Sequence, residues 1–253
     1  MSCKIDYQAP SGLLAGRVIL VTGAGDGIGR AAALSYAAHG ATVVLLGRTL
    51  GKLEAVYDEI EARGGPQPAI FPLNFEGVTH KDYQELADRI GSEFGRLDGV
   101  LHNAGLLGGL RPFAEYDPEL WERVMQVNIN GPIWMTRALL PLLEASPDAS
   151  VIFTSSGVGR KGRALWGAYA VSKFATEGFV QVLAAELEAE TAIRVNSLNP
   201  GRTRTAMRAA AVPDEDSATL RTPAAIMPTY LWLMGPDSRG HTGERFDAQP
   251  PAR

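Results

Sequence analysis

A tyrosine and a lysine stand four residues apart in the segment Tyr169-Ala170-Val171-Ser172-Lys173. We expect residues 167–188 to form a helix, and residues four apart on a helix share one face. The phenol and the ammonium would then lie in one site. The pKa of an ordinary tyrosine is about 10, and a nearby positive charge lowers it by stabilising the tyrosinate. The pattern predicts that Tyr169 acts as an acid or base near neutral pH, although an exposed helix face could show the same spacing.

A second chemical pattern is the glycine-rich stretch Thr22-Gly23-Ala24-Gly25-Asp26-Gly27-Ile28-Gly29. It follows an apolar run that we expect to be a strand, and it opens a stretch that we expect to be a helix. Glycines allow a tight turn and let the backbone approach a pyrophosphate, while the helix N-terminus attracts the anion. A structural strand–helix turn is the alternative. The stretch predicts a dinucleotide-binding turn formed by Gly23, Gly25, Asp26, Gly27, Ile28 and Gly29.

The elements that must position these residues alternate along the chain. Continuous apolar runs, typical of strands buried on both faces, predict strands over 17–22, 41–46, 69–73, 98–102, 150–154, 193–198 and 244–247. Longer stretches predict helices over 27–39, 50–63, 79–94, 118–144, 167–188 and 223–234. The helix over 118–144 should bend near Pro132 and end around Pro141. Such alternation indicates an α/β Rossmann fold, a doubly wound parallel sheet of about seven strands flanked by helices.

We expect the chain, residues 1–253, to form a single domain with three less regular segments. Residues 1–13 should be a loose N-terminal extension. Residues 202–222 have little apolar periodicity and should form a mobile substrate lid. Residues 249–253 contain two prolines and should be an extended tail.

The glycine spacing is the TGxxxGxG form, and together with the YxxxK motif it resembles the classical short-chain dehydrogenase/reductase family. Extended members of that superfamily, which include sugar epimerases, usually show a TGxxGxxG spacing. The resemblance covers approximately residues 14–248. Through the stretches DGIGR, VLHNAGLLG and FDAQP, it is closest to the bacterial YciK-type branch.

The resemblance implies a catalytic group of Asn128, Ser156, Tyr169 and Lys173. Ser156 lies 13 residues before Tyr169, where the family places its catalytic serine, and Asn128 lies 41 residues before it. Ser156 would hydrogen-bond the substrate oxygen, and Lys173 would hold the nicotinamide ribose. Asn128 would anchor a water that links Lys173 to solvent. The alternatives Ser155, which should point into the sheet, and Asn130 are disfavoured.

In this family the end of the second strand distinguishes the two nicotinamide cofactors. An acidic residue there favours NAD, whereas this chain has Gly47 and then Arg48, whose guanidinium can pair with a 2′-phosphate. We therefore expect NADP(H), with NAD(H) as the alternative and Asp26 as a counter-signal; Arg48 could also be a solvated charge. His102 replaces the first asparagine of the family's NNAG motif. The resemblance adds cofactor contacts at Asn74, near the adenine, and at Asn103, Ala104, Gly105, Pro200, Gly201, Thr203 and Thr205, besides Tyr169 and Lys173.

These features predict an oxidoreductase that transfers a hydride between NADP(H) and a ketone or secondary alcohol, with Tyr169 as general acid/base. The alternative is a non-catalytic dinucleotide-binding sensor or scaffold on the same fold. The glycine spacing disfavours an epimerase or dehydratase. Trp166 could lie at the pocket mouth. Six basic residues are expected near the ends of the strands, and they are Arg160, Lys161, Arg163, Arg202, Arg204 and Arg208. They could bind an anionic substrate. Alternatively, they form a solvated charged rim that is countered by the acids at 214–216.

Composition and charge bound the partners. The 24 Lys+Arg against 28 Asp+Glu give a net charge of −4, which argues against coating nucleic acid or anionic lipid. No apolar run approaches the ~20 residues that span a bilayer, so we expect neither a signal peptide nor a membrane partner. The single cysteine, Cys3, suggests a cytoplasmic location, and the scattered histidines predict no metal site. The long helices over 118–144 and 167–188 should pair chains into a homodimer or homotetramer.

Overall fold

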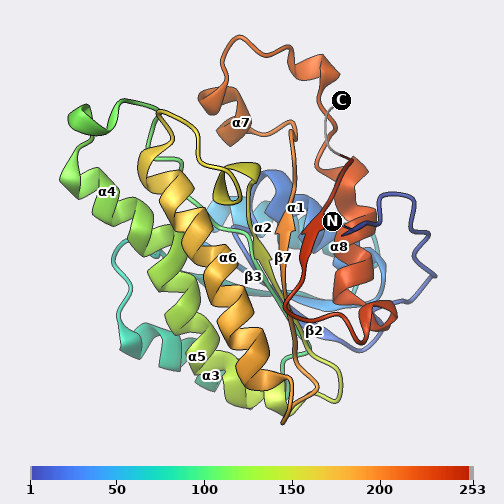
Figure 1. The fold of residues 1–253 in the computed structure, drawn as a ribbon. Helices are drawn as coiled ribbons and strands as arrows, with labels where there is room; N and C mark the ends of the chain where they lie inside the picture. Colours follow the sequence, from blue (N-terminus) through green and yellow to red (C-terminus); the bar gives the residue numbers. More distant parts are fainter. Residues whose placement is uncertain (1, 251–253) are drawn as a thin grey trace.

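The strands predicted from the apolar runs form one parallel sheet in the computed structural model, which describes residues 2–250 (Figure 1). Across this part of the chain the sheet has eight strands in the order β1-β8-β7-β6-β5-β2-β3-β4. Every neighbouring pair is parallel, and β2 is buried along its whole length. The strands are β1 Ser2–Cys3, β2 Val18–Thr22, β3 Thr42–Gly47, β4 Ala69–Pro72, β5 Gly99–His102, β6 Ser150–Thr154, β7 Arg194–Asn199 and β8 Arg245–Asp247. The predicted Rossmann fold is confirmed.

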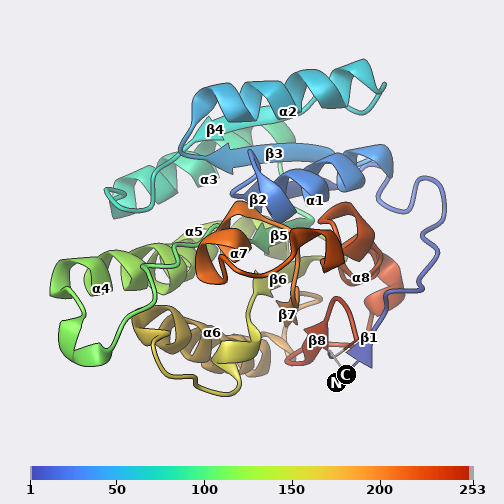
Figure 2. The same cartoon turned by 90° about the horizontal axis from the view of Figure 1, so that it is seen from above.

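Helices cover both faces of the sheet, as Figure 2 shows from above. One layer contains α1 Gly27–Ala38, α2 Leu50–Ala62 and α8 Met227–Met234. The other contains α3 His80–Phe94, α4 Pro118–Met125, α5 Gly131–Glu144 and α6 Gly167–Leu187. The short α7, Ala206–Ala211, lies above the carboxyl ends of the strands. Because both faces are covered, the inner strands β2, β3, β5 and β6 are largely apolar rather than alternating.

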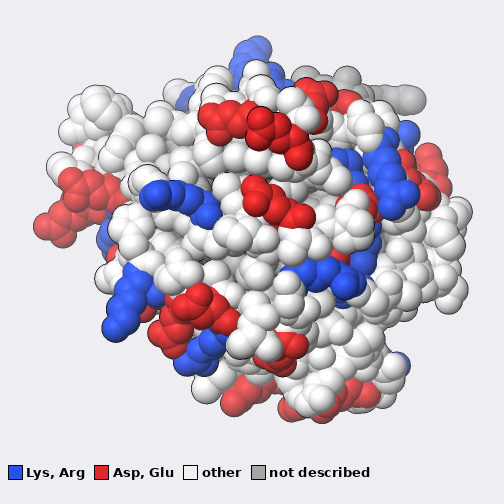
Figure 3. Space-filling view, turned by 90° about the horizontal axis from the view of Figure 1, so that it is seen from below, with Lys and Arg blue, Asp and Glu red and all other residues white. Residues whose placement is uncertain are grey.

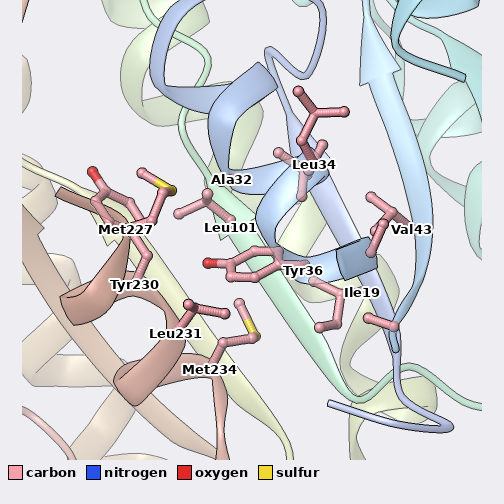
Figure 4. Close-up of a cluster of buried hydrophobic side chains, with 14 of the residues drawn as sticks. Ile19, Ala32, Leu34, Tyr36, Val43, Leu101, Met227, Tyr230, Leu231 and Met234 are labelled. Atoms are coloured by element: carbon pink, nitrogen blue, oxygen red, sulfur yellow. The ribbon is translucent and has the colours of Figure 1, made fainter. Parts of the chain in front are cut away.

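The first layer is held by an apolar cluster between α1 and α8 (Figure 4). Tyr36 of α1 is fully buried, and its ring points toward Leu231 and Met234 of α8. Nearly every residue of α8 is buried, which explains why that helix is apolar all round. The cluster fixes α1, and with it the glycine-rich turn at its N-terminus, against β2.

The strand order places a crevice beside β2. From β2 the chain crosses to β3 and then β4 on one side. It then returns to β5 on the other side of β2, so the direction of the crossovers reverses at β2. In open α/β sheets, ligands bind outside the carboxyl ends of the strands at such a point. Both chemical patterns of the sequence, the glycine-rich turn after β2 and the YxxxK motif, therefore belong at this edge.

The predicted helix over 118–144 is interrupted. A wide π-helical turn, Gln126–Asn130, separates α4 from α5. Pro132 lacks the N–H that a continuous α-helix would bond to the carbonyl of residue 128, so the turn widens just before it. The expected end around Pro141 is wrong, because α5 contains Pro141 and continues to Glu144.

Two of the three segments expected to be irregular have structure of their own. Residues 2–3 add β1 to the edge of β8, and the Tyr7 hydroxyl donates to Asp237 at 2.8 Å, unlike the loose extension predicted over 1–13. A two-residue strand has no periodic pattern, so only its partner reveals it. Within 202–222 lie α7 and a bridge between Thr203 and Arg221. Of the predicted tail over 249–253, residues 251–253 lie outside the described residues.

The surface carries charges of both signs, as expected from 24 Lys+Arg and 28 Asp+Glu. On the face seen from below, opposite the crevice, basic and acidic side chains are interspersed (Figure 3). Among residues 2–250 no helix is both long enough and apolar enough to cross a membrane. Over the same range no group of three or more histidine, cysteine or acidic side chains is arranged to hold a metal ion.

Candidate active site

Two adjoining pockets open at the carboxyl ends of the strands. The larger, with a volume of about 410 Å³, reaches Ser156, Tyr169 and Lys173. The smaller, of about 280 Å³, reaches Lys52 and Asn74. Both pockets are lined by Gly23, Asp26, Arg48, Ala104 and Gly105. The two patterns singled out in the sequence thus lie in one continuous cleft.

The predicted catalytic side chains Ser156, Tyr169 and Lys173 come together in the larger pocket. Tyr169 and Lys173 lie on one face of α6, with the lysine Nζ 5.7 Å from the centroid of the tyrosine ring. The ammonium donates to the Thr154 carbonyl at 2.7 Å, at the end of β6. Ser156, two residues further on, makes a side-chain hydrogen bond with Tyr169. One helix and one strand end therefore position a hydroxyl, a phenol and an amine together.

Burial dominates the pKa values of this group. It raises the pKa of Tyr169, and the hydrogen bond with Ser156 only partly opposes it. Burial also lowers the pKa of Lys173 to about 8, against the opposing charge of Glu177. The net shift of the Tyr169 pKa is upward, opposite to the lowering predicted from the sequence, because desolvation of the phenol is its largest cause.

Asn128 supports the site from behind. It lies in the π-helical turn, is buried, and does not line either pocket. Its amide Nδ2 donates to the Leu106 carbonyl at 2.9 Å and to the Ser172 hydroxyl at 3.0 Å, and its Oδ1 accepts from the Leu106 N–H at 2.7 Å. Asn128 thereby links the loop after β5 to the residue before Lys173.

The glycine-rich turn has the close approaches that its spacing predicts. Gly23 has a φ of +67°, which favours glycine. A Cβ on Gly29 would lie 2.1 Å from the Gly23 carbonyl oxygen, so Gly29 is needed for packing and does not line the cleft. Gly25 lines the smaller pocket, and Gly27 and Ile28 line the larger one. Such a bare turn at the start of α1 fits a pyrophosphate.

The far end of the cleft carries two cations, each with an acidic neighbour. The Arg48 side chain is 68% exposed and lies 3.6 Å from Glu76, so it is only loosely paired. Asn74 lines the same pocket, and its Oδ1 accepts from the Glu76 N–H. Lys52, one turn into α2, also lines it and bonds Asp26 at 2.5 Å. Lys52 was not identified from the sequence, although its position four residues after Arg48 was a signal.

The segment after β5 is fixed by β2. The Thr22 hydroxyl accepts from the backbone N–H groups of Asn103 and Ala104 at 2.9 and 3.0 Å. The Asn103 side chain donates to the Thr22 carbonyl, and the residue also lines the larger pocket. His102 is buried against Thr136, and burial lowers its pKa to about 3. The turn therefore keeps its place with histidine at that position.

The segment after β7 forms the opposite wall. The residues predicted there, Pro200, Gly201, Thr203 and Thr205, all line the larger pocket. Thr205 caps α7 by accepting from the Arg208 N–H. The buried Thr203 hydroxyl donates to the Pro200 carbonyl and accepts from Gln249 at 3.2 Å.

Glu177 is a site residue that sequence reasoning missed. It lies one turn after Lys173 on α6 and is buried. Its carboxylate accepts from Ser155 and Ser197 and pairs with Arg160 and Arg245. Ser155 lines the larger pocket together with Ser156, but its hydroxyl is bound to Glu177. The available signal was a glutamate four residues after Lys173, on the same buried face of the helix.

The arginines near the site are mostly paired. Arg160 bonds Glu177 and Asp247 instead of facing the cleft. Arg202 and Arg208 both bind Glu215, the countercharge that the sequence suggested. Arg204 donates to the Leu220 carbonyl. These contacts favour a neutralised rim over an anion-binding surface.

Comparisons with known proteins agree with this arrangement. The model of the short chain dehydrogenase family matches residues 17–216. The uncharacterized oxidoreductase YciK of Escherichia coli K12 is 58% identical over 244 residues, which are 96% of each chain. A short-chain dehydrogenase of Shigella flexneri 2a complexed with NADP is 58% identical with a TM-score of 0.93, covering 95% of this chain and all of that one. One of Escherichia coli CFT073 complexed with NADPH is 59% identical with a TM-score of 0.92 and the same coverage. The chain belongs to the short-chain dehydrogenase/reductase family of oxidoreductases, within its YciK-like group.

Proposed function

We propose that the chain is an NADP(H)-dependent oxidoreductase that interconverts a ketone and a secondary alcohol, with Tyr169 as general acid/base. The observation that carries the proposal is the meeting of Ser156, Tyr169 and Lys173 in a pocket continuous with the glycine-rich turn. The NADP and NADPH complexes of the similar proteins support the cofactor.

The cleft fits a dinucleotide phosphate from one end to the other. Arg48 and Lys52 at the smaller pocket would bind the 2′-phosphate, with Asn74 beside the adenine. The turn over 23–29 would bind the pyrophosphate, with Thr205 near the phosphates, and Pro200, Gly201 and Thr203 would hold the nicotinamide end. When bound, the cofactor supplies or accepts the hydride.

The protein's own residues move the proton. In reduction, the Tyr169 hydroxyl gives its proton to the carbonyl oxygen as the carbon gains a hydride; in oxidation the phenolate takes it back. The Ser156 hydroxyl donates to the substrate oxygen and stabilises its developing charge. Lys173, held by Thr154, places a cation next to the phenolate that reduction leaves behind.

Tyr169→Phe tests the enzyme proposal against a non-catalytic sensor. The variant keeps the ring and its packing against Trp166 but loses the proton. With NADPH and a panel of carbonyl compounds, we expect kcat to fall by at least about 100-fold, with NADPH affinity by calorimetry kept within about threefold. A wild-type protein that binds NADPH but reduces nothing in the panel would favour the sensor.

Arg48→Ala tests the cofactor choice. The variant should weaken NADPH binding by about tenfold, because a charge-assisted contact to phosphate is lost, and should leave NADH binding unchanged. Arg89→Ala, an exposed arginine paired within α3, serves as the matched control. Equal loss of NADPH and NADH affinity would contradict the role of Arg48.

We further propose a homodimer or homotetramer built on α5 and α6. Val171, Phe174 and Val182 lie exposed along α6 and Trp134 lies exposed on α5, which is an unusual amount of apolar surface for neighbouring helices. A Phe174→Glu variant should lower the mass measured by light scattering. We also propose that 202–222 acts as a substrate lid, and that the protein is cytoplasmic, as its single cysteine suggests.

A further inference from the structure

The larger pocket, which contains Tyr169, has several apolar lining residues. Leu107, Trp166, Met207 and Ala211 line it. The Trp166 ring lies next to the Tyr169 ring, with centroids 5.8 Å apart. Met207 projects from α7 and remains 36% exposed, which is unusual for a large apolar side chain. An aromatic and a flexible thioether side chain facing a pocket are suited to packing an apolar ligand.

Charged groups are scarce beside these residues. Of the described residues that line the larger pocket, Asp26, Arg48, Lys173 and Arg208 are charged. Asp26 and Arg48 also line the smaller pocket, at the dinucleotide end. The Lys173 ammonium is buried and bound to Thr154. Among the described residues that line the larger pocket, Arg208 on α7 is the remaining cation.

Arg208 is already engaged. Its Nε and Nη2 bind the two oxygens of Glu215, so its fork is occupied in the bidentate manner that a substrate carboxylate would need. The arginines hold the pKa of Glu215 down at about 2, so the carboxylate persists at neutral pH. Residues 202–216 carry three arginines and three acids, a net charge of zero. A substrate anion would have to displace Glu215.

We propose that the substrate is an uncharged ketone or secondary alcohol with an apolar body that packs against Trp166 and Met207, and that Glu215 excludes anionic substrates by occupying Arg208. The inference rests on the proposed function, since it names the substrate class of the same site. It replaces the anionic substrate that the arginines near the strand ends suggested from sequence.

A matched substrate pair tests the charge requirement. Methyl 4-oxocyclohexanecarboxylate is neutral, and 4-oxocyclohexanecarboxylate differs by a charge at the far end of the ring. With NADPH, kcat/KM should be at least about tenfold higher for the ester, because the acid brings an unpaired charge to these apolar residues. Equal values, or a preference for the acid, would overturn the inference while leaving the proposed function intact.

Glu215→Gln tests the exclusion mechanism. Freeing Arg208 should raise kcat/KM for the acid by about five- to tenfold and change that for the ester less than twofold. Glu54→Gln, an exposed acid on α2, is the matched control and should change neither. The double variant Glu215→Gln, Arg208→Gln should remove the gain. If kcat/KM for the acid were the same in Glu215→Gln as in the wild type, Glu215 would not be the residue that excludes anionic substrates.

Ligand-observed NMR on the NADPH-loaded protein separates failure of the inference from failure of the proposed function. If the ester binds and the acid does not, but neither is reduced, the substrate class stands and the enzyme proposal falls. If the acid binds as well as the ester, or if neither binds, the inference is overturned. Trp166→Ala should weaken ester binding several-fold, which reports whether the ligand packs where proposed.

Discussion

Replacing Lys173 with methionine should stabilise the fold at neutral pH while it abolishes the proposed activity. Burial lowers the pKa of Lys173 from 10.5 to about 8, and the residue is only 4% exposed. At about 1.4 kcal/mol per pH unit, this difference amounts to about 3 kcal/mol against the folded state. The lost hydrogen bond to Thr154 offsets about 1 kcal/mol. We therefore expect the variant to be about 2 kcal/mol more stable at pH 7.

The pH dependence gives the sharper measurement. Between about pH 8 and 10.5 the unfolded chain keeps the lysine proton that the folded chain has lost, so the free energy of unfolding of the wild type rises with pH there. The Lys173→Met variant lacks this rise, and most of the difference should therefore disappear between pH 7 and pH 10. Above pH 10 the buried tyrosines Tyr36 and Tyr230, whose pKa values are raised, act in the opposite direction.

Urea unfolding at fixed protein concentration, at unit pH steps from 7 to 10, provides the assay. Lys81→Met, which removes an exposed lysine on α3, is the control and should follow the wild type. A difference between wild type and Lys173→Met that stays constant over this range would refute the reasoning, since it would mean that Lys173 titrates alike in both states.

Two further substitutions test the surroundings of the site. Glu177→Gln should lower the pKa of Lys173 below about 8, because the Glu177 charge raises it; the pH profile of kcat/KM should move to lower pH, and an unmoved profile would contradict the contact. Gly29→Ala should destabilise the protein by about 2 kcal/mol or more, because its Cβ would meet the Gly23 carbonyl at 2.1 Å. Thermal unfolding measures this effect, with Gly51→Ala on α2 as the control because its Cβ would meet nothing within 4 Å.

Several site residues could be predicted because their signals are local. The turn over 23–29 is a strand, a set of glycines and a helix start in immediate succession, and backbone conformation alone dictates those residue types. Tyr169 and Lys173 lie together because helix geometry brings residues four apart onto one face. The strand lengths and the parallel sheet followed from apolar runs buried on both faces.

Other features depended on residues far apart in the chain. The side chain of Asn128 binds Leu106 and Ser172, which lie 22 and 44 residues away in the chain, and the water that would link it to Lys173 remains a prediction. The strand at residues 2–3 exists only because β8 offers an unpaired edge.

The sequence by itself determined the sheet, the glycine-rich turn and the tyrosine–lysine face, because each follows from spacing within one or two elements. Only the tertiary structure decided which charges are available to a ligand. Arg160 pairs with Asp247, which lies 87 residues further along the chain. Glu177 of α6 accepts a hydrogen bond from Ser197 of β7, which lies 20 residues further along. Ion pairing depends on distance in space, which no short-range pattern reports. Substrate charge therefore had to be read from the folded chain.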